Sequence, residues 1–174
     1  MKLFTFGYGM KKKVSGRSAL FRRCLEEAGV SLLLDTRDSP WGGFWNPKNI
    51  QSILDDSPVT YRFKEEDYHW HKVLGAAKRI RSHAVDDFEL FRRLYLEDLE
   101  NKDPDALQKL FNLLEEEGSV AIMCCEPFIP RADHSLERLP EWNCHRFILA
   151  DEMVKRGFLS LEQIQHLDLD DLVQ

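Results

Sequence analysis

The chain has 174 residues, of which 43% are hydrophobic and 31% charged, and its net charge is −6. These values are typical of one globular domain with a full core, so we expect a single domain over residues 1–174. No apolar run reaches the roughly 18 residues of a membrane helix, and the acidic total gives no sign of a general attraction to nucleic acid. The N-terminal segment is too short for a secretion signal, which predicts a cytoplasmic protein with no membrane partner.

Strand and helix signals alternate along the chain. Short apolar runs predict strands at residues 3–6, 30–34, 59–63 and 119–123. Helical spacing of apolar residues predicts helices at residues 18–28, 47–54, 85–99, 103–118 and 144–156. Residues 64–84 carry no clear signal, and the last 17 residues fit a strand, a helix or both. The alternation predicts an α/β fold, a single three-layer domain with a mostly parallel sheet flanked by helices.

Helix boundaries are marked by capping residues. Asn46-Pro47 and Asp103-Pro104 each place a capping side chain before a proline, which is typical of a helix start. Gly29, Gly118 and Gly157 each follow a helical pattern, where glycine ends a helix.

Polar residues follow three of the predicted strands, at Gly7–Gly9, Asp35–Arg37 and Cys124–Glu126. Ligands of open α/β sheets bind beyond the carboxyl ends of the strands, so we expect these stretches to meet. Arg37 would bind a phosphate or carboxylate with two hydrogen bonds, and Asp35 would orient it or act as a base. The alternative is a structural ion pair at the end of the strand.

Cys144-His145-Arg146 would form the first turn of a helix capped by Asn143. Free N–H groups there favour an anion and would stabilise the thiolate of Cys144. These residues would also make a zinc ligand set with Cys124 or Glu126, but two closely spaced ligand pairs are missing, so no metal or cofactor is assigned. The third interpretation is that Cys124 and Cys144 only fill the core.

Other chemically active residues have simpler explanations. Cys24 lies on the apolar face of a helix and is expected in the core, and Cys125 alternates in direction with Cys124. Residues 68–71, rich in aromatic side chains and histidine, are a structural segment or stack a base. The basic stretch 78–81 is a solvated surface or reaches phosphates. The loop at residues 127–143, stiffened by proline, is a lid or a surface excursion.

Six short motifs resemble the bacterial and archaeal family known as domain of unknown function 488. In chain order they are Thr5-Phe6-Gly7-Tyr8-Gly9, Asp35-Thr36-Arg37-Asp38-Ser39-Pro40, Asn46-Pro47, Leu74-Gly75, Met123-Cys124-Cys125-Glu126 and Cys144-His145-Arg146 with Ala150-Asp151 downstream. The resemblance covers residues 3–157 and leaves 158–174 as a C-terminal extension. It implies a compact α/β domain with one shared site, and it supplies no reaction. Ala76 stands where the family has a second glycine, and the segment before Cys144 is longer than is typical of it.

The residues of that shared site suggest an enzyme, a hydrolase or a transferase, that binds a phosphorylated or nucleotide-like anion. The resemblance and the residue chemistry together assign catalytic roles to Asp35, Glu126, Cys144 and His145. They assign binding roles to Tyr8, Arg37, Cys124 and Arg146. The alternatives are a nucleic-acid-associated domain and a Cys/His metal or redox site. The oligomeric state is not predicted.

Overall fold

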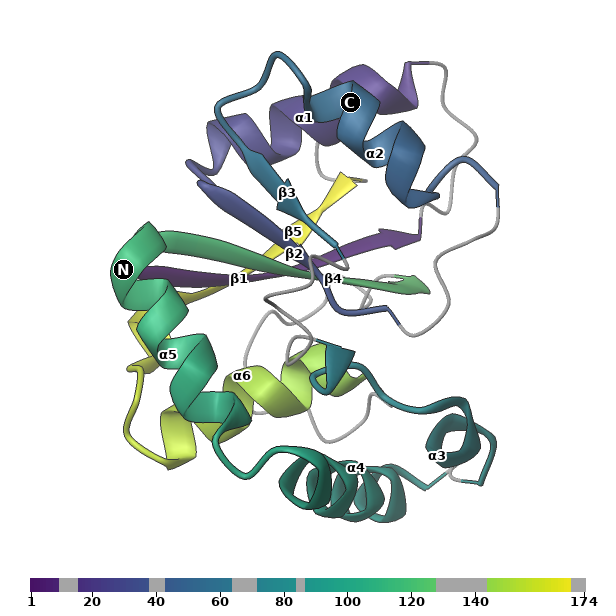
Figure 1. Cartoon of the computed structure of the whole chain (residues 1–174), viewed down its shortest axis with the longest axis vertical. Helices are drawn as coiled ribbons and strands as arrows, with labels where there is room; N and C mark the ends of the chain where they lie inside the picture. The colour runs from purple at the N-terminus through teal and green to yellow at the C-terminus, as the bar shows by residue number, and fades with distance from the viewer. Residues whose placement is uncertain (10–15, 38–42, 64–71, 84–86, 128–143, 170–174) are drawn as a thin grey trace.

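The first and last strands of the protein lie side by side in one sheet (Figure 1). The computed structural model describes residues 1–9, 16–37, 43–63, 72–83, 87–127 and 144–169, with the side chains of 9, 83, 125–127 and 168 left out. Lys11–Lys13, Tyr68–His71, Asn143 and almost all of the loop 127–143 lie outside the described residues.

Five strands form the sheet. They are β1 (Lys2–Gly9), β2 (Leu32–Asp35), β3 (Thr60–Arg62), β4 (Ser119–Pro127) and β5 (Ile164–Asp168). Their order is β3-β2-β4-β1-β5, and every pair is parallel. The predicted parallel sheet is confirmed, and β5 comes from the segment that the resemblance left as an extension.

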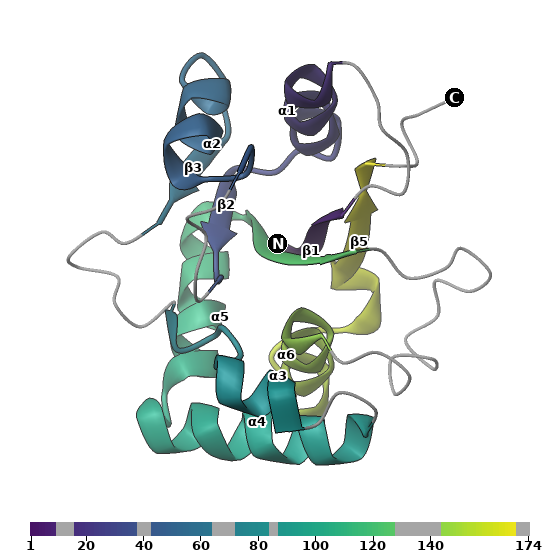
Figure 2. The same cartoon turned by 90° about the vertical axis from the view of Figure 1, so that its right-hand side faces the viewer.

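Helices cover both faces of this sheet and complete the three layers (Figures 1 and 2). On one face lie α1 (Arg17–Glu27) and α2 (Pro47–Leu54). The other face carries α3 (Lys78–His83), α4 (Phe88–Lys102), α5 (Ala106–Glu117) and α6 (His145–Lys155). A one-turn 3-10 helix, η3 (Leu161–Gln163), precedes β5. Within the described part of the chain, no helix is both long and apolar enough to cross a membrane.

Local sequence explains most helix boundaries. The side chain of Asn46 accepts a hydrogen bond of 3.1 Å from the amide of Asn49, and Pro47 is the first residue of α2, as predicted. Gly118 follows α5 at φ 74°, a conformation that a residue with a Cβ rarely adopts.

Two predicted helix starts are wrong. Asp103 closes α4, and α5 begins three residues later behind Asp105, because the Asp103 carboxylate accepts from the amide of Asp105 in the intervening turn. At α6 the N-cap position belongs to Cys144, which has extended backbone angles, and not to Asn143.

The strands alternate between two hydrophobic cores. Residues facing the α4–α6 layer belong to the larger core, among them Leu3, Leu32, Leu34, Val120 and Ile122. Their chain neighbours belong to the core under α1 and α2, among them Phe4, Phe6, Leu33, Ala121 and Met123. Successive strand residues point to opposite faces, so each strand end also presents its residues to two different sides.

The chain reverses its direction of travel across the sheet between the neighbouring strands β2 and β4, whose onward connections lead to opposite sides. From β2 it passes through α2 to β3 on one side, whereas from β4 it passes through α6 to β5 on the other side. In open α/β sheets, ligands bind at the carboxyl ends of the strands at such a switch point. On its other side β4 pairs with β1. Here Gly7 pairs with Cys124, and Tyr8 alone then faces both Cys125 and Glu126, which makes a bulge. Bulges of this kind often lie beside active sites.

Candidate functional site

The predicted site residues divide between the two faces of the sheet. Asp35 ends β2 and Arg37 follows two positions later, so both lie on the α1–α2 side. Thr36 between them lies on the α6 side, where its hydroxyl is 3.1 Å from His145 Nε2. The residue of this motif that reaches the Cys-His segment is therefore Thr36.

Asp35 and Arg37 form a buried ion pair. Arg37 donates from Nε to Asp35 Oδ1 at 2.7 Å and from a terminal nitrogen to Oδ2 at 2.5 Å. The Arg37 amide and the Tyr61 hydroxyl supply two further donors to the same carboxylate. Asp35 is fully buried, and these four donors fill its oxygens. This geometry favours the structural ion pair over a free base.

The remaining donors of Arg37 also contact protein groups. One terminal nitrogen donates to the carbonyl of Trp45 at 2.7 Å and to the Tyr8 hydroxyl at 3.2 Å. Burial lowers the pKa of Arg37, but the hydrogen bonds and charge of Asp35 outweigh it and raise the pKa above its ordinary value. Arg37 stays charged, and with Tyr8 and Trp45 it joins the end of β2 to the segment before α2.

Replacing Tyr61 by phenylalanine is expected to lower the free energy of unfolding by about 1.5–3 kcal/mol, because a donor to a charged carboxylate is lost. Burial, followed by the charge of Asp35, raises the pKa of Tyr61. A tyrosine whose pKa is higher in the folded than in the unfolded state contributes stability below the unfolded pKa of about 10. That contribution is lost as the pH rises above this value. Urea unfolding between pH 8 and 11 should therefore show a shallower pH dependence for Tyr61→Phe than for the wild type. Equal slopes would contradict this role.

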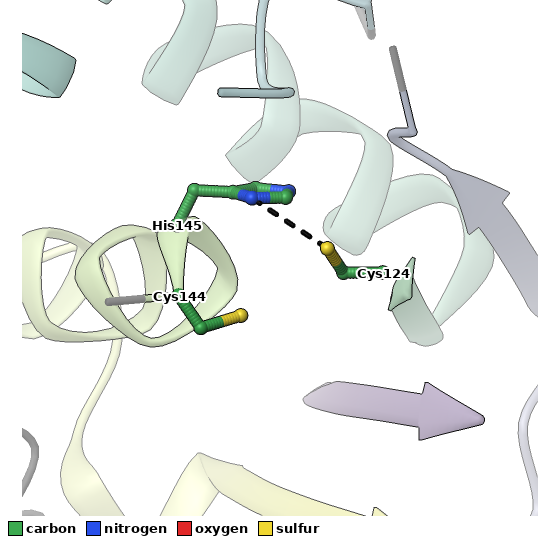
Figure 3. A group of neighbouring side chains, drawn as sticks. All are labelled: Cys124, Cys144 and His145. Atoms are coloured by element: carbon green, nitrogen blue, oxygen red, sulfur yellow. Dashed lines mark hydrogen bonds between the residues drawn. The ribbon is translucent and has the colours of Figure 1, made fainter. Parts of the chain in front are cut away.

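Cys124 and His145 meet on the opposite face. Cys124 Sγ lies 3.7 Å from His145 Nδ1, and both side chains are buried (Figure 3). The Thr36 hydroxyl donates to the carbonyl of Met123 at 2.9 Å, so its oxygen must accept from His145 Nε2. This places a proton on Nε2, so in the neutral imidazole the lone pair of Nδ1 faces the sulfur.

Tyr95 of α4 and Gly75, which precedes α3, hold this arrangement in place. The ring of Tyr95 packs on His145 with centroids 5.8 Å apart, and its hydroxyl donates to the carbonyl of Leu74 at 2.6 Å. A Cβ on Gly75 would lie 2.1 Å from the carbonyl oxygen of Thr36. The Leu74-Gly75 motif therefore packs directly against the residue that orients His145.

Cys144 brings a second sulfur to the same place. It precedes the first residue of α6, and its Sγ, Cys124 Sγ and a ring nitrogen of His145 all lie within 4.8 Å of one another. Figure 3 shows the three side chains pointing toward one another. Cys24 instead belongs to the core under α1, as predicted.

Arg146 is a buried cation with no carboxylate partner among the described residues. It is only 3% exposed, and one terminal nitrogen donates to the carbonyl of Phe6 at 3.0 Å. Among the described residues it forms no ion pair, and its Nε has no hydrogen-bond partner. Its guanidinium lies against Gly7, where a Cβ would be 2.4 Å from a terminal nitrogen.

The other candidates are only partly placed. The backbone of Glu126 lies in the β4 bulge, while the side chains of Glu126 and Cys125 lie outside the described residues. In the basic stretch, Arg79 forms an ion pair with Asp98 at 2.5 Å. Tyr68 and Trp70 also lie outside the described residues, so a nucleic-acid surface here stays a prediction.

Sequence reasoning assigned no role to Thr36, Gly75 or Tyr95. The first two stand inside quoted motifs, and strand alternation between Asp35 and Arg37 was the available signal for Thr36. Nothing in the sequence distinguishes Tyr95 from the other residues on the apolar face of its helix.

The fold and these contacts define an open parallel α/β protein with a thiol, imidazole and guanidinium cluster beside β4 and β1. The family model described as Domain of unknown function DUF488 matches residues 17–153, and the chain belongs to this family. No curated protein matches the chain, and no solved structure matches it either.

Proposed function

We propose that the protein is an enzyme that binds a phosphorylated or nucleotide-like anion at the carboxyl ends of β1 and β4. The observation that carries this proposal is the buried guanidinium of Arg146, which forms no ion pair within the described residues. A buried charge is costly unless it is paired, and an anionic ligand would supply the missing partner. Arginine suits phosphate and carboxylate groups because its donors match their geometry.

The position of Arg146 supports a ligand site. Arg146 lies in the first turn of α6, where backbone N–H groups also favour an anion. It rests on Gly7, which pairs with Cys124 on the neighbouring strand, about 4.8 Å away. The proposed anion would therefore lie beside the Cys124 and His145 pair.

The chemistry proposed for this site is proton transfer with a thiol. His145 Nδ1 would take the proton of the Cys124 thiol, because its lone pair faces that sulfur. Cys144 is the second candidate nucleophile, and Glu126 would act as an acid or base from the bulge. Asp35 and Arg37 are reassigned to holding the end of β2, since protein groups surround both side chains.

Titration of the wild type with inorganic phosphate, sulfate and adenosine monophosphate tests the anion site. We expect at least one of these anions to raise the melting temperature, because a ligand that binds only the native state stabilises it. Arg146→Leu should lose at least tenfold in affinity, measured by calorimetry.

The matched control is Arg93→Leu, which removes an exposed arginine of α4 and should leave anion binding unchanged. Absence of binding in the wild type at low salt would contradict the proposal. Equal affinity of Arg146→Leu and the wild type would contradict the role of Arg146.

A further inference from the structure

We infer that Cys124, Cys144 and His145 form a binding site for a thiophilic metal ion, with Zn²⁺ as the expected occupant. The inference rests on the proposed function, because it uses the thiol and imidazole groups of that same site. With the ion bound these groups would act as ligands, so the proton transfer from Cys124 to His145 would belong to the metal-free protein. The metal site is independent of Arg146, whose anion would bind beside the ion.

Three possible ligand atoms converge in one place. They come from the end of β4 and the start of α6, twenty residues apart in the chain, and lie within 4.8 Å of one another. Tetrahedral zinc with Zn–S bonds of ~2.3 Å separates its sulfur ligands by roughly 3.8 Å. Each ligand atom therefore needs to move by no more than about 1 Å, which side-chain rotation supplies.

His145 is oriented as a metal ligand would be. Its Nε2–H is held by Thr36, whose own hydroxyl proton goes to the carbonyl of Met123. Histidines that bind metals are generally oriented in this way by a hydrogen bond from the other ring nitrogen. Nδ1 is left with its lone pair toward Cys124 Sγ, as a ligand requires (Figure 3).

Cys124 and Cys144 differ from a cysteine that only fills the core. Cys24 packs among the hydrophobic residues under α1, whereas Cys124 and Cys144, although equally buried, belong to neither hydrophobic core of the described residues. Each instead lies beside a sulfur and an imidazole nitrogen.

Thiolates and imidazole together prefer zinc and other thiophilic ions over magnesium or calcium. Two thiolates would also neutralise the charge of Zn²⁺ in this buried place. Three protein ligands leave a fourth position, as in catalytic zinc sites. When Zn²⁺ is bound, the cysteines and His145 act as ligands, and the ion supplies Lewis-acid chemistry next to the anion site.

Cobalt titration of the full chain tests this inference. Protein purified without an affinity tag is reduced and freed of metal, and Co²⁺ is then added. We expect one equivalent to produce the sulfur-to-cobalt charge-transfer band and the visible bands of tetrahedral cobalt, and Zn²⁺ to displace it. Cys124→Ser and Cys144→Ser should each weaken binding by at least tenfold, as should His145→Ala.

Cys24→Ser is the matched control and should keep the full cobalt spectrum, because it removes a buried cysteine from the opposite face. A wild-type protein that shows no charge-transfer band and holds no zinc overturns the metal site. If phosphate binding through Arg146 persists in that case, the anion site stands and only the metal fails. A normal cobalt spectrum without any anion binding would support the metal site and contradict the anion site.

Discussion

Arg37→Leu is expected to lower the free energy of unfolding by about 3–5 kcal/mol, the range for removing one partner of a buried ion pair. The substitution leaves the carboxylate of Asp35 fully buried with only the Tyr61 hydroxyl and one backbone amide as donors. Attraction between the two charges offsets the cost of burying them, and leucine cannot replace it. Urea unfolding at pH 7 measures the loss.

The comparison variant is Arg62→Leu, which breaks the half-buried pair of Arg62 with Glu117 at 2.7 Å. Solvent reaches that pair, so the expected loss is only about 1 kcal/mol. Adding Asp35→Asn to Arg37→Leu should recover part of the stability, because the uncompensated charge disappears. A loss below 1 kcal/mol for Arg37→Leu would refute the structural role of the pair.

Gly75→Ala is expected to have the second largest effect, because it would disturb the stability and the site together. The new methyl group would lie 2.1 Å from the carbonyl oxygen of Thr36, a backbone atom that cannot rotate away. Overpacking of this kind typically costs about 1–3 kcal/mol, and this contact should fall at the upper end. Displacement of Thr36 would also release the Nε2 hydrogen bond of His145.

Two measurements check this prediction. Urea unfolding should show the loss of stability, and the rate of thiol alkylation should change because Cys124 loses its oriented imidazole partner. Gly29→Ala is the control, since its methyl group meets open space and the cost of about 1 kcal/mol comes from the positive φ alone. Thiol reactivity should be unchanged in that control. Equal losses of stability and equal rates of thiol alkylation in Gly75→Ala and Gly29→Ala would contradict the role of the contact between Gly75 and Thr36.

Local signals accounted for much of the fold. Asn46-Pro47 marked the start of α2 because capping depends only on neighbouring backbone groups. The apolar run at residues 30–34 indicated a strand buried on both faces, which β2 is. β5 could not be identified in this way, because its residues 164–168 mix polar and apolar side chains and become a strand by pairing with β1.

The sequence indicated which segments of the chain form the candidate site, but only some of the side chains that meet there. Strand ends and the motif resemblance placed Cys124 and the Cys144–Arg146 segment at one edge, and the structure brings these residues together. It separates them from Asp35 and Arg37, which lie on the other face of the sheet. Alternation along β2 implied that the side chain of Thr36 lies on the opposite face of the sheet from those of Asp35 and Arg37. It did not show which of the two faces α6 would cover.

The sequence by itself determined the alternation of strands and helices, because hydrophobic periodicity and capping are local properties. It also determined which segments end at the edge where Cys124 lies. Only the tertiary structure decided that Thr36 orients His145, that Gly75 packs on Thr36, and that Arg146 is buried with no ion pair among the described residues. Those three facts depend on which helices cover each face of the sheet, and that is decided by long-range packing.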